Sequence, residues 1–240
     1  MNVQDLPNYG KDLFTIGIMT KTPLRKKLAL LPPVLCFLGG IIQILGLRGT
    51  VRMIRQFKAE VTRAQTLDWT HLDARGLTRQ DLLGIIRKIV LAKVLADTLG
   101  METAARLRNA MSNAIAYDAL EEVFAPPEIF LRCGNGDFLT AFKQYYVALM
   151  QAMEKRGLEA AEVVEDTPDT FQINVTYCAW AEVAKTLGNA YYCYYSTCYG
   201  DEVFFPKLCA VAGFQYHRTG ILATGKPVCD HRFTRLEQLL

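Results

Sequence analysis

The chain has 240 residues, of which 51% are hydrophobic and 21% are charged. This balance predicts a folded protein with a sizeable core and excludes a disordered one. Charge is spread unevenly, because residues 1–64 hold ten Lys or Arg against three Asp or Glu, which gives +7 there and −4 in the remainder. An anionic partner would meet the N-terminal quarter first. Few aromatic residues interleave with these basic residues, so we expect no nucleic-acid partner.

The seven cysteines are an odd number, with no CxxC pair among them and no secretory leader at the start of the chain. This usage favours reduced thiols in a cytoplasmic protein over a disulfide framework. Glycine-rich phosphate loops and the GxSxG and HExxH motifs are absent from the sequence. We therefore expect no cofactor.

The first predicted element is an uncharged apolar segment, residues 28–47, with basic residues at both ends. Its length suits a membrane span, but paired prolines and paired glycines interrupt it, and a basic amphipathic helix continues over residues 41–64. We favour a helix packed on the body of the protein. Association of residues 28–58 with an anionic membrane surface is the second hypothesis, and a true span is the third.

Helices are predicted for the middle of the chain. Thr78 with Asp81 three residues later is typical of a helix start, and Gly100 of the end of that helix. A second helix is expected over residues 102–120. A third is expected over residues 137–153, where large apolar side chains recur on one face.

The pattern changes to strands after Gly157. Alternating apolar residues around a turn at residues 167–169 predict one hairpin, and a second is expected near the C-terminus, at 214–219 and 228–233. Two short helices should lie between the hairpins, at 178–187 and from Thr197 to Pro206.

The predicted fold class is α+β, with a helical N-terminal two-thirds and a small C-terminal antiparallel sheet flanked by short helices. We divide the chain into a basic and apolar N-terminal segment, a helical region and an α+β module that carries the site: residues 1–64, 65–157 and 158–240.

The stretch YYCYYSTCYGDE at residues 191–202 contains the first candidate for chemistry. If Thr197 caps a helix, Cys198 lies in its first turn and Asp201 projects from the same side. Unpaired amides at a helix start favour a thiolate. The alternative is a small buried residue in an aromatic layer.

The last predicted strand supplies a second cluster, in which alternation places Cys229 and His231 on one face and Asp230 on the other. On the strand before it, Arg218 offers a guanidinium fork suited to a carboxylate. Zinc-compatible donors are present as well, but not in the short paired spacings of structural zinc sites, so we expect no metal. These donors are Cys178, Cys198, Asp201, Cys229 and His231.

Taken in order, these motifs make the C-terminal third similar to the L-2-amino-thiazoline-4-carboxylic acid hydrolase family. The similarity covers roughly residues 160–234 and is looser in the helical part. The chain departs from the family pattern at His231, where an aromatic residue often follows the C-D pair. The matching motifs are C-x-x-D at Cys198 to Asp201, R-T at Arg218-Thr219, G at Gly225 and C-D at Cys229-Asp230. A cysteine that precedes a helix, Cys178, matches as well.

The resemblance implies a hydrolase that acts on a non-peptide C–N or C–S bond of a cyclic amidine. A small carboxylate substrate such as 2-amino-thiazoline-4-carboxylate would be opened to a carbamoyl-cysteine after attack by an activated thiolate. The expected roles are nucleophile for Cys198, then Cys229, then Cys178; amidine orientation for Asp201 and Asp230; proton transfer for His231 or His217; and carboxylate binding for Arg218 beside Thr219.

Two other functions fit the same residues. One is a non-catalytic binding module in which the tyrosines of residues 191–199 line a small-ligand pocket. The other is a zinc-dependent hydrolase that uses the Cys, His and Asp donors. In each case the expected partner is a small molecule, and the sequence gives no oligomeric state.

Overall fold

The computed structural model describes residues 24–120 and 124–236. Helices dominate the first part of the chain, as predicted. The helical elements are α2 (Leu24–Gln65), α3 (Thr70–Asp73), α4 (Arg79–Leu99), α5 (Met101–Leu120), α6 (Pro127–Cys133), α7 (Phe138–Lys155), α8 (Ala179–Thr186), α9 (Tyr191–Cys193), η2 (Tyr194–Cys198), α10 (Tyr199–Ala212) and η3 (Leu222–Thr224).

One antiparallel sheet follows, with strand order β1-β2-β4-β3. Both predicted hairpins are present, so the α+β class is confirmed. The last hairpin is shorter than predicted on its first strand, because β3 ends at His217 and leaves Arg218 and Thr219 in the loop that follows. The strands are β1 (Glu159–Asp166), β2 (Thr170–Cys178), β3 (Phe214–His217) and β4 (Cys229–Arg235).

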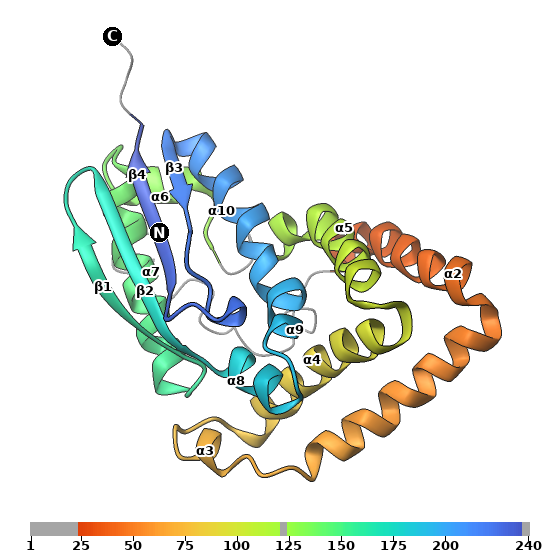
Figure 1. The fold of residues 1–240 in the computed structure, drawn as a ribbon. Helices are drawn as coiled ribbons and strands as arrows, with labels where there is room; N and C mark the ends of the chain where they lie inside the picture. Colours follow the sequence, from red (N-terminus) through yellow and green to blue (C-terminus); the bar gives the residue numbers. More distant parts are fainter. Residues whose placement is uncertain (1–23, 121–123, 237–240) are drawn as a thin grey trace.

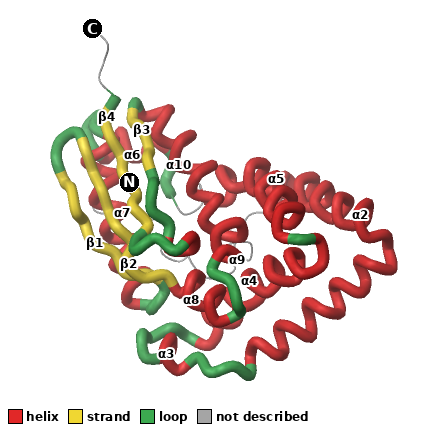
Figure 2. The backbone as a smooth tube through the Cα atoms, viewed as in Figure 1, coloured by secondary structure: helices red, strands yellow, loops and turns green. Residues whose placement is uncertain are grey.

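The elements form a helical part and a sheet part joined by α10. Figure 1 shows the sheet at one end of the molecule, with α7 against one of its faces, and α2, α4 and α5 at the other end. α10 contacts both α5 and β3, so it lies between the two parts. Figure 2 shows the same division, with the yellow strands gathered on one side of the red helices.

An aromatic core holds α7 on the sheet. Phe142 of α7 packs edge to face on Phe233 of β4, with ring centroids 4.8 Å apart. Phe205 of α10 packs on the same Phe233 at 5.3 Å. One buried ring thus links the sheet to both helices, and fixes the position of β4 relative to α10.

The helix ends follow the sequence signals. The Thr78 hydroxyl accepts a hydrogen bond from the Asp81 backbone N–H and caps α4, and Gly100 ends this helix with a positive φ of 81°. Asp137 caps α7 by accepting from the Leu139 N–H. These boundaries agree with the predictions, because each cap is a local interaction between neighbours in the sequence.

Candidate active site

The segment that carries Cys198 differs from the prediction. The chain is helical without a break from Tyr191 to Ala212, and a π-helical turn, η2, joins α9 to α10. The expected helix start at Thr197 is therefore wrong, and so is the expected end at Pro206, which lies inside α10. Cys198 has helical φ and ψ angles of −64° and −30°. The amide-rich helix start that we invoked for a thiolate is absent at this residue.

The π turn gives Cys198 a different environment. A π-helix pairs residues five apart, so it places the side chains of Cys193 and Cys198 above one another. Their sulfur atoms are 3.6 Å apart. Tyr195, inside the same turn, is fully buried and donates a hydrogen bond from its hydroxyl to the Ala92 carbonyl of α4. Contacts to α4 thus anchor the turn that aligns the two thiols.

A third thiol joins this pair. Cys178 ends β2 and hydrogen-bonds with Cys193 and with Glu159, whose Oε1 lies 3.7 Å from the Cys178 sulfur. The bond with Cys193 lowers the pKa of Cys178, but burial and Glu159 outweigh it and leave the pKa raised. Hydrogen bonds from Cys178 and Cys198, together with burial, raise the pKa of Cys193 well above its usual value. Cys178 and Cys193 are therefore neutral thiols at ordinary pH.

Arg218 crosses from the sheet to α10. Its side chain is 2% exposed and donates to Asp201 Oδ2 at 2.8 Å, to Glu202 Oε1 at 3.0 Å and to the Cys198 carbonyl at 2.8 Å. Burial lowers the pKa of Arg218, but Asp201 and Tyr216 raise it by more, so the guanidinium stays charged. The fork that we expected to bind a substrate carboxylate is thus occupied by two carboxylates of the protein.

Asp230 fixes the loop that carries Arg218. Its Oδ1 accepts from the Thr219 and Gly220 N–H groups, and its Oδ2 accepts from the Thr219 hydroxyl at 2.6 Å. A side chain at Gly220 would place its Cβ 2.7 Å from the Val228 carbonyl, so only glycine fits there. Burial raises the pKa of Asp230, but the bonds from Thr219 and Gly220 outweigh it and lower the pKa overall. We call Thr219, Gly220 and Asp230 the loop clamp.

The alternation predicted for β4 is observed, with Cys229, His231 and Phe233 buried on one face. The Cys229 sulfur accepts from the Leu222 N–H at 3.3 Å, and burial raises the pKa of this thiol. Burial lowers the pKa of His231 to about 3, and its Nδ1 lies 3.0 Å from the Tyr216 hydroxyl. His231 is therefore a neutral imidazole at ordinary pH. His217, by contrast, is exposed at the end of β3, opposite Arg232.

Lys88 on α4 was not among the predicted site residues. Burial and Arg108 lower its pKa, whereas Cys193, Cys198 and Asp201 raise it. Solvent still reaches this side chain, since its accessible area places it among the exposed residues. Lys88 thus lies within electrostatic range of Cys193, Cys198 and Asp201, and part of its side chain is open to solvent. The basic pair Arg87-Lys88 between apolar helix positions gives no sequence signal of such a role.

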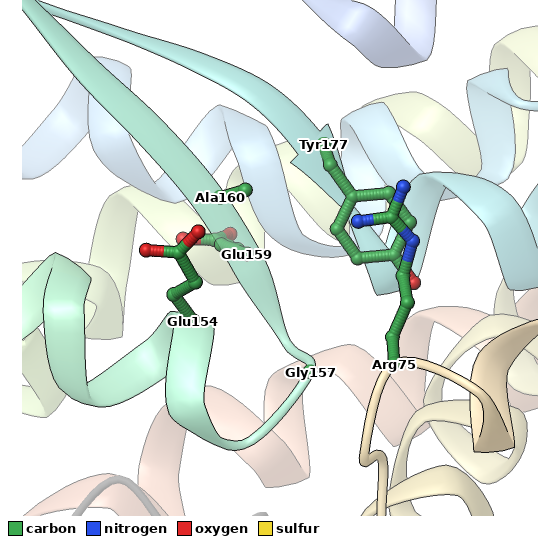
Figure 3. A pocket seen from close by; sticks show the side chains of 6 residues that line it. All are labelled: Arg75, Glu154, Gly157, Glu159, Ala160 and Tyr177. Carbon is green, nitrogen blue, oxygen red and sulfur yellow. The ribbon is translucent and has the colours of Figure 1, made fainter.

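Glu159 is a second residue that was missed. It opens β1, directly opposite Cys178 in the strand register. Burial and Asp201 raise its pKa to about 8, against a lowering by the Cys178 hydrogen bond. Figure 3 shows that Glu159 also lines a recess with Glu154, where the Arg75 guanidinium stacks 3.8 Å above the Tyr177 ring. Glu159 therefore joins a surface recess to the buried thiols.

This arrangement lies within the part of the chain that matches a known family. The model of the L-2-amino-thiazoline-4-carboxylic acid hydrolase family matches residues 83–233, more than half of the chain. The chain belongs to this family. The family's name indicates a hydrolase of L-2-amino-thiazoline-4-carboxylate. Searches of curated proteins and of solved structures found no match.

The family match covers Lys88, Glu159 and Cys178 as well as the C-terminal motifs on which the resemblance rested. Within residues 24–120 and 124–236, no group of three or more His, Cys, Asp and Glu side chains is placed to hold a metal ion. The residues that the structure describes therefore contain no set of ligands of the kind that the zinc hypothesis requires.

The loop clamp can be tested with Asp230→Asn. The uncharged amide has a single acceptor oxygen for three donors, so we expect the free energy of unfolding to fall by about 1–3 kcal/mol in urea denaturation at neutral pH. Because the pKa of Asp230 is lowered on folding, the parent should lose this stabilisation as the pH falls through that pKa, and the two proteins should converge in acid. Thr219→Ser keeps the hydroxyl donor and serves as the control. Equal stability of Asp230→Asn and the parent at neutral pH would contradict the clamp.

Glu159→Gln tests the neutral carboxyl. Because the pKa of Glu159 is raised to about 8, the folded chain keeps a proton that the unfolded chain releases above about pH 4.5, so stability should fall as pH rises between these values. The neutral amide should remove this slope and be more stable than the parent by about 1 kcal/mol or more near pH 8. Urea denaturation at pH values near both pKa values measures this change in the free energy of unfolding. Glu162→Gln, at an exposed position of β1, is the control. An unchanged slope would show that Glu159 is ionised in the fold.

Proposed function

We propose that this family member hydrolyses a cyclic isothiourea or amidine that carries a carboxylate, 2-amino-thiazoline-4-carboxylate first among them, through the thiol of Cys198. The observation that carries the proposal is the position of Cys198 on the π turn. Its sulfur lies 3.6 Å from that of Cys193, its carbonyl accepts a hydrogen bond from Arg218, and it lies within electrostatic range of Lys88. The thiolate is the nucleophilic form of cysteine, so we take this sulfur as the candidate nucleophile of the site.

The reaction would run in two steps. The Cys198 sulfur forms a bond to the carbon that carries ring nitrogen, ring sulfur and the exocyclic amino group. The ring C–S bond then breaks, and the departing sulfur takes up a proton, which leaves an enzyme-bound isothiourea. Water adds to the same carbon, the Cys198 sulfur leaves, and a carbamoyl-cysteine is released with net uptake of one water.

The other thiols are weaker candidates for the nucleophile. The pKa values of Cys178, Cys193 and Cys229 are all raised, and burial contributes in each case. A thiol held neutral is a poor nucleophile near pH 7. This supports the expected order in which Cys198 ranks first.

We assign the binding of the substrate carboxylate to Lys88 and not to Arg218. The Nη1 and Nη2 groups of Arg218 donate to Asp201, Glu202 and the Cys198 carbonyl, and removing these acceptors would leave the buried guanidinium charge unpaired. Lys88 is accessible to solvent and interacts with the same thiol pair. Arg218 and Thr219 would then be positioning residues, because they set the place of Asp201 and of Cys198.

Proton transfer is assigned to Glu159, and amidine orientation to Asp201. A carboxyl group with a pKa near 8 can donate a proton at neutral pH and regain it from water. Glu159 reaches both the Cys178 thiol and the recess of Figure 3, which gives it a route to solvent. His231, with a pKa of about 3, would remain neutral through the cycle, and Asp230 would act through the loop clamp.

The tyrosines give less support to a binding module. Tyr195 is fully buried and bonded to α4, and Tyr191 stacks on Tyr194 with ring centroids 5.0 Å apart. Tyr194 in turn donates to Glu202. These rings are engaged in packing and in hydrogen bonds to α4 and to Glu202, so we rank ligand binding without turnover second.

The proposal is tested by steady-state hydrolysis of 2-amino-thiazoline-4-carboxylate. We expect Cys198→Ser to lower kcat by about 1,000-fold or more, because a hydroxyl in this position is a far weaker nucleophile. Cys36→Ser, at an exposed thiol on α2, should retain the parent's kcat and KM.

The second arm of this experiment separates catalysis from binding. Isothermal titration should show that Cys198→Ser still binds the substrate, whereas Lys88→Met should raise KM or abolish binding. Turnover by Cys198→Ser at the parent's rate would exclude the thiol mechanism. Tight binding without turnover by the parent itself would favour the binding module.

A further inference from the structure

Helix α2 exposes an unusual amount of apolar surface. Eight of the twelve exposed large hydrophobic side chains in the described residues lie on this one helix, with 38–71% of their area accessible. By length and composition, the segment Leu31–Gln65 passes as a candidate membrane span. Scattered single apolar residues are normal on a protein surface, but a cluster of this size marks an interaction surface.

Seven of these eight side chains form two stripes that meet at a corner, and the eighth, Ile44, lies on another face of the first arm. On the first arm, Leu31, Leu35, Leu38 and Ile42 recur every three or four residues and so share one face. At Gly46 the backbone leaves the helical region, with φ 67° and ψ 172°, and the helix turns sharply. Figure 1 shows this corner at the outer edge of the molecule, away from the sheet.

The second arm continues the apolar surface and adds charge. Leu47, Val51 and Ile54 form its stripe, and Leu47 at the corner is 71% exposed. An arginine follows each of them directly, at residues 48, 52 and 55, and these three arginines are exposed. One residue is about 100° around the helix, so a row of cations runs along the edge of the apolar stripe. This is the arrangement of a helix that lies in the interface of an anionic bilayer.

The opposite face of α2 is packed on the protein. Ile41 and Met53 are buried, and Gly40 lies so close to α5 that an added Cβ would stand 3.2 Å from Leu107. The uncharged part of the first arm, from Leu28 to the kink at Gly46, is about 27 Å long, slightly less than the roughly 30 Å of a bilayer core. The helix is therefore held against the body and is kinked, which suits contact with a membrane surface and not a crossing.

Charge also decides between a membrane and a second copy of the chain. The segment Leu31–Gln65 holds five basic residues and one acidic residue, Glu60. Glu60 is bound by Arg63 at 2.8 Å. In a symmetric dimer through this face, the arginine rows would approach one another without acids to pair with them. An anionic lipid surface supplies the missing charge.

We propose that the corner of α2 docks the protein on an anionic membrane surface. The two apolar stripes insert among the lipid headgroups and the ends of the acyl chains. The arginine row binds lipid phosphates and carboxylates. α2 lies outside the residues matched by the family, and no residue of the docking surface has a role in the proposed chemistry.

Co-sedimentation of the full chain with vesicles tests the proposal. The parent should bind phosphatidylcholine vesicles that contain about one-third phosphatidylserine, bind pure phosphatidylcholine vesicles far more weakly, and lose binding as salt is raised. A triple change of Arg48, Arg52 and Arg55 to Gln should weaken binding about tenfold or more. A triple change of Leu47, Val51 and Ile54 to Ser should abolish it at every salt concentration.

The matched controls remove similar groups elsewhere. Arg79→Gln, Arg132→Gln and Lys226→Gln together delete three exposed charges, and Val211→Ser deletes an apolar side chain that is 64% exposed. Both controls should bind as the parent does, and circular dichroism should show the parent's helicity in every variant. Failure of the parent to bind anionic vesicles, or equal binding by the α2 variants, overturns the proposal.

A probe at Cys36 adds a direct readout. Cys36 is exposed on the first arm, whereas the other six cysteines are buried, so a thiol-reactive, polarity-sensitive dye should label it selectively. Its emission should shift to the blue on addition of the anionic vesicles. The contrary result is a blue shift that appears without vesicles and grows with protein concentration, together with a dimer in sedimentation equilibrium. This result would assign the exposed face of α2 to a second copy of the chain.

Discussion

The buried guanidinium of Arg218 is the interaction on which the site depends. It joins the loop after β3 to Asp201, Glu202 and the carbonyl of Cys198, and so ties the sheet to the π turn and α10. An unpaired charge at such a place costs several kcal/mol, so the loop and the helix must keep this arrangement together. Asp230 then fixes the loop from β4. The thiol cluster owes its geometry to this network.

Much of the architecture was predictable because its signals are local. Thr78, Asp137 and Gly100 mark helix ends through contacts between near neighbours, and alternation along β4 predicted that Cys229 and His231 share one face. The π turn was not predictable in this way. It is held by distant contacts, from Tyr195 to α4 and from Arg108 to the Ser196 carbonyl, which no spacing in residues 191–202 reveals.

The roles of the charged groups were the least predictable part of the site. Arg218 has a sequence pattern suited to substrate binding, but its acidic partners lie 16 and 17 residues earlier, on α10. Lys88 and Glu159 look like ordinary solvated residues until the fold places them against the thiols. Arg108 also contacts Phe37 of α2, with its guanidinium carbon 5.9 Å from the ring centroid, so the helix proposed to meet the membrane touches the support of the π turn.

The central claim is that the Cys198 sulfur bonds to the substrate carbon during turnover. Acid quenching of the enzyme with 2-amino-thiazoline-4-carboxylate in the steady state, followed by digestion and peptide mass spectrometry, measures this directly. The account predicts a mass increase equal to one substrate molecule on the peptide that contains Cys198, and its disappearance when substrate is exhausted. An adduct on Cys178 or Cys229, or active turnover with no adduct on any thiol, would contradict it.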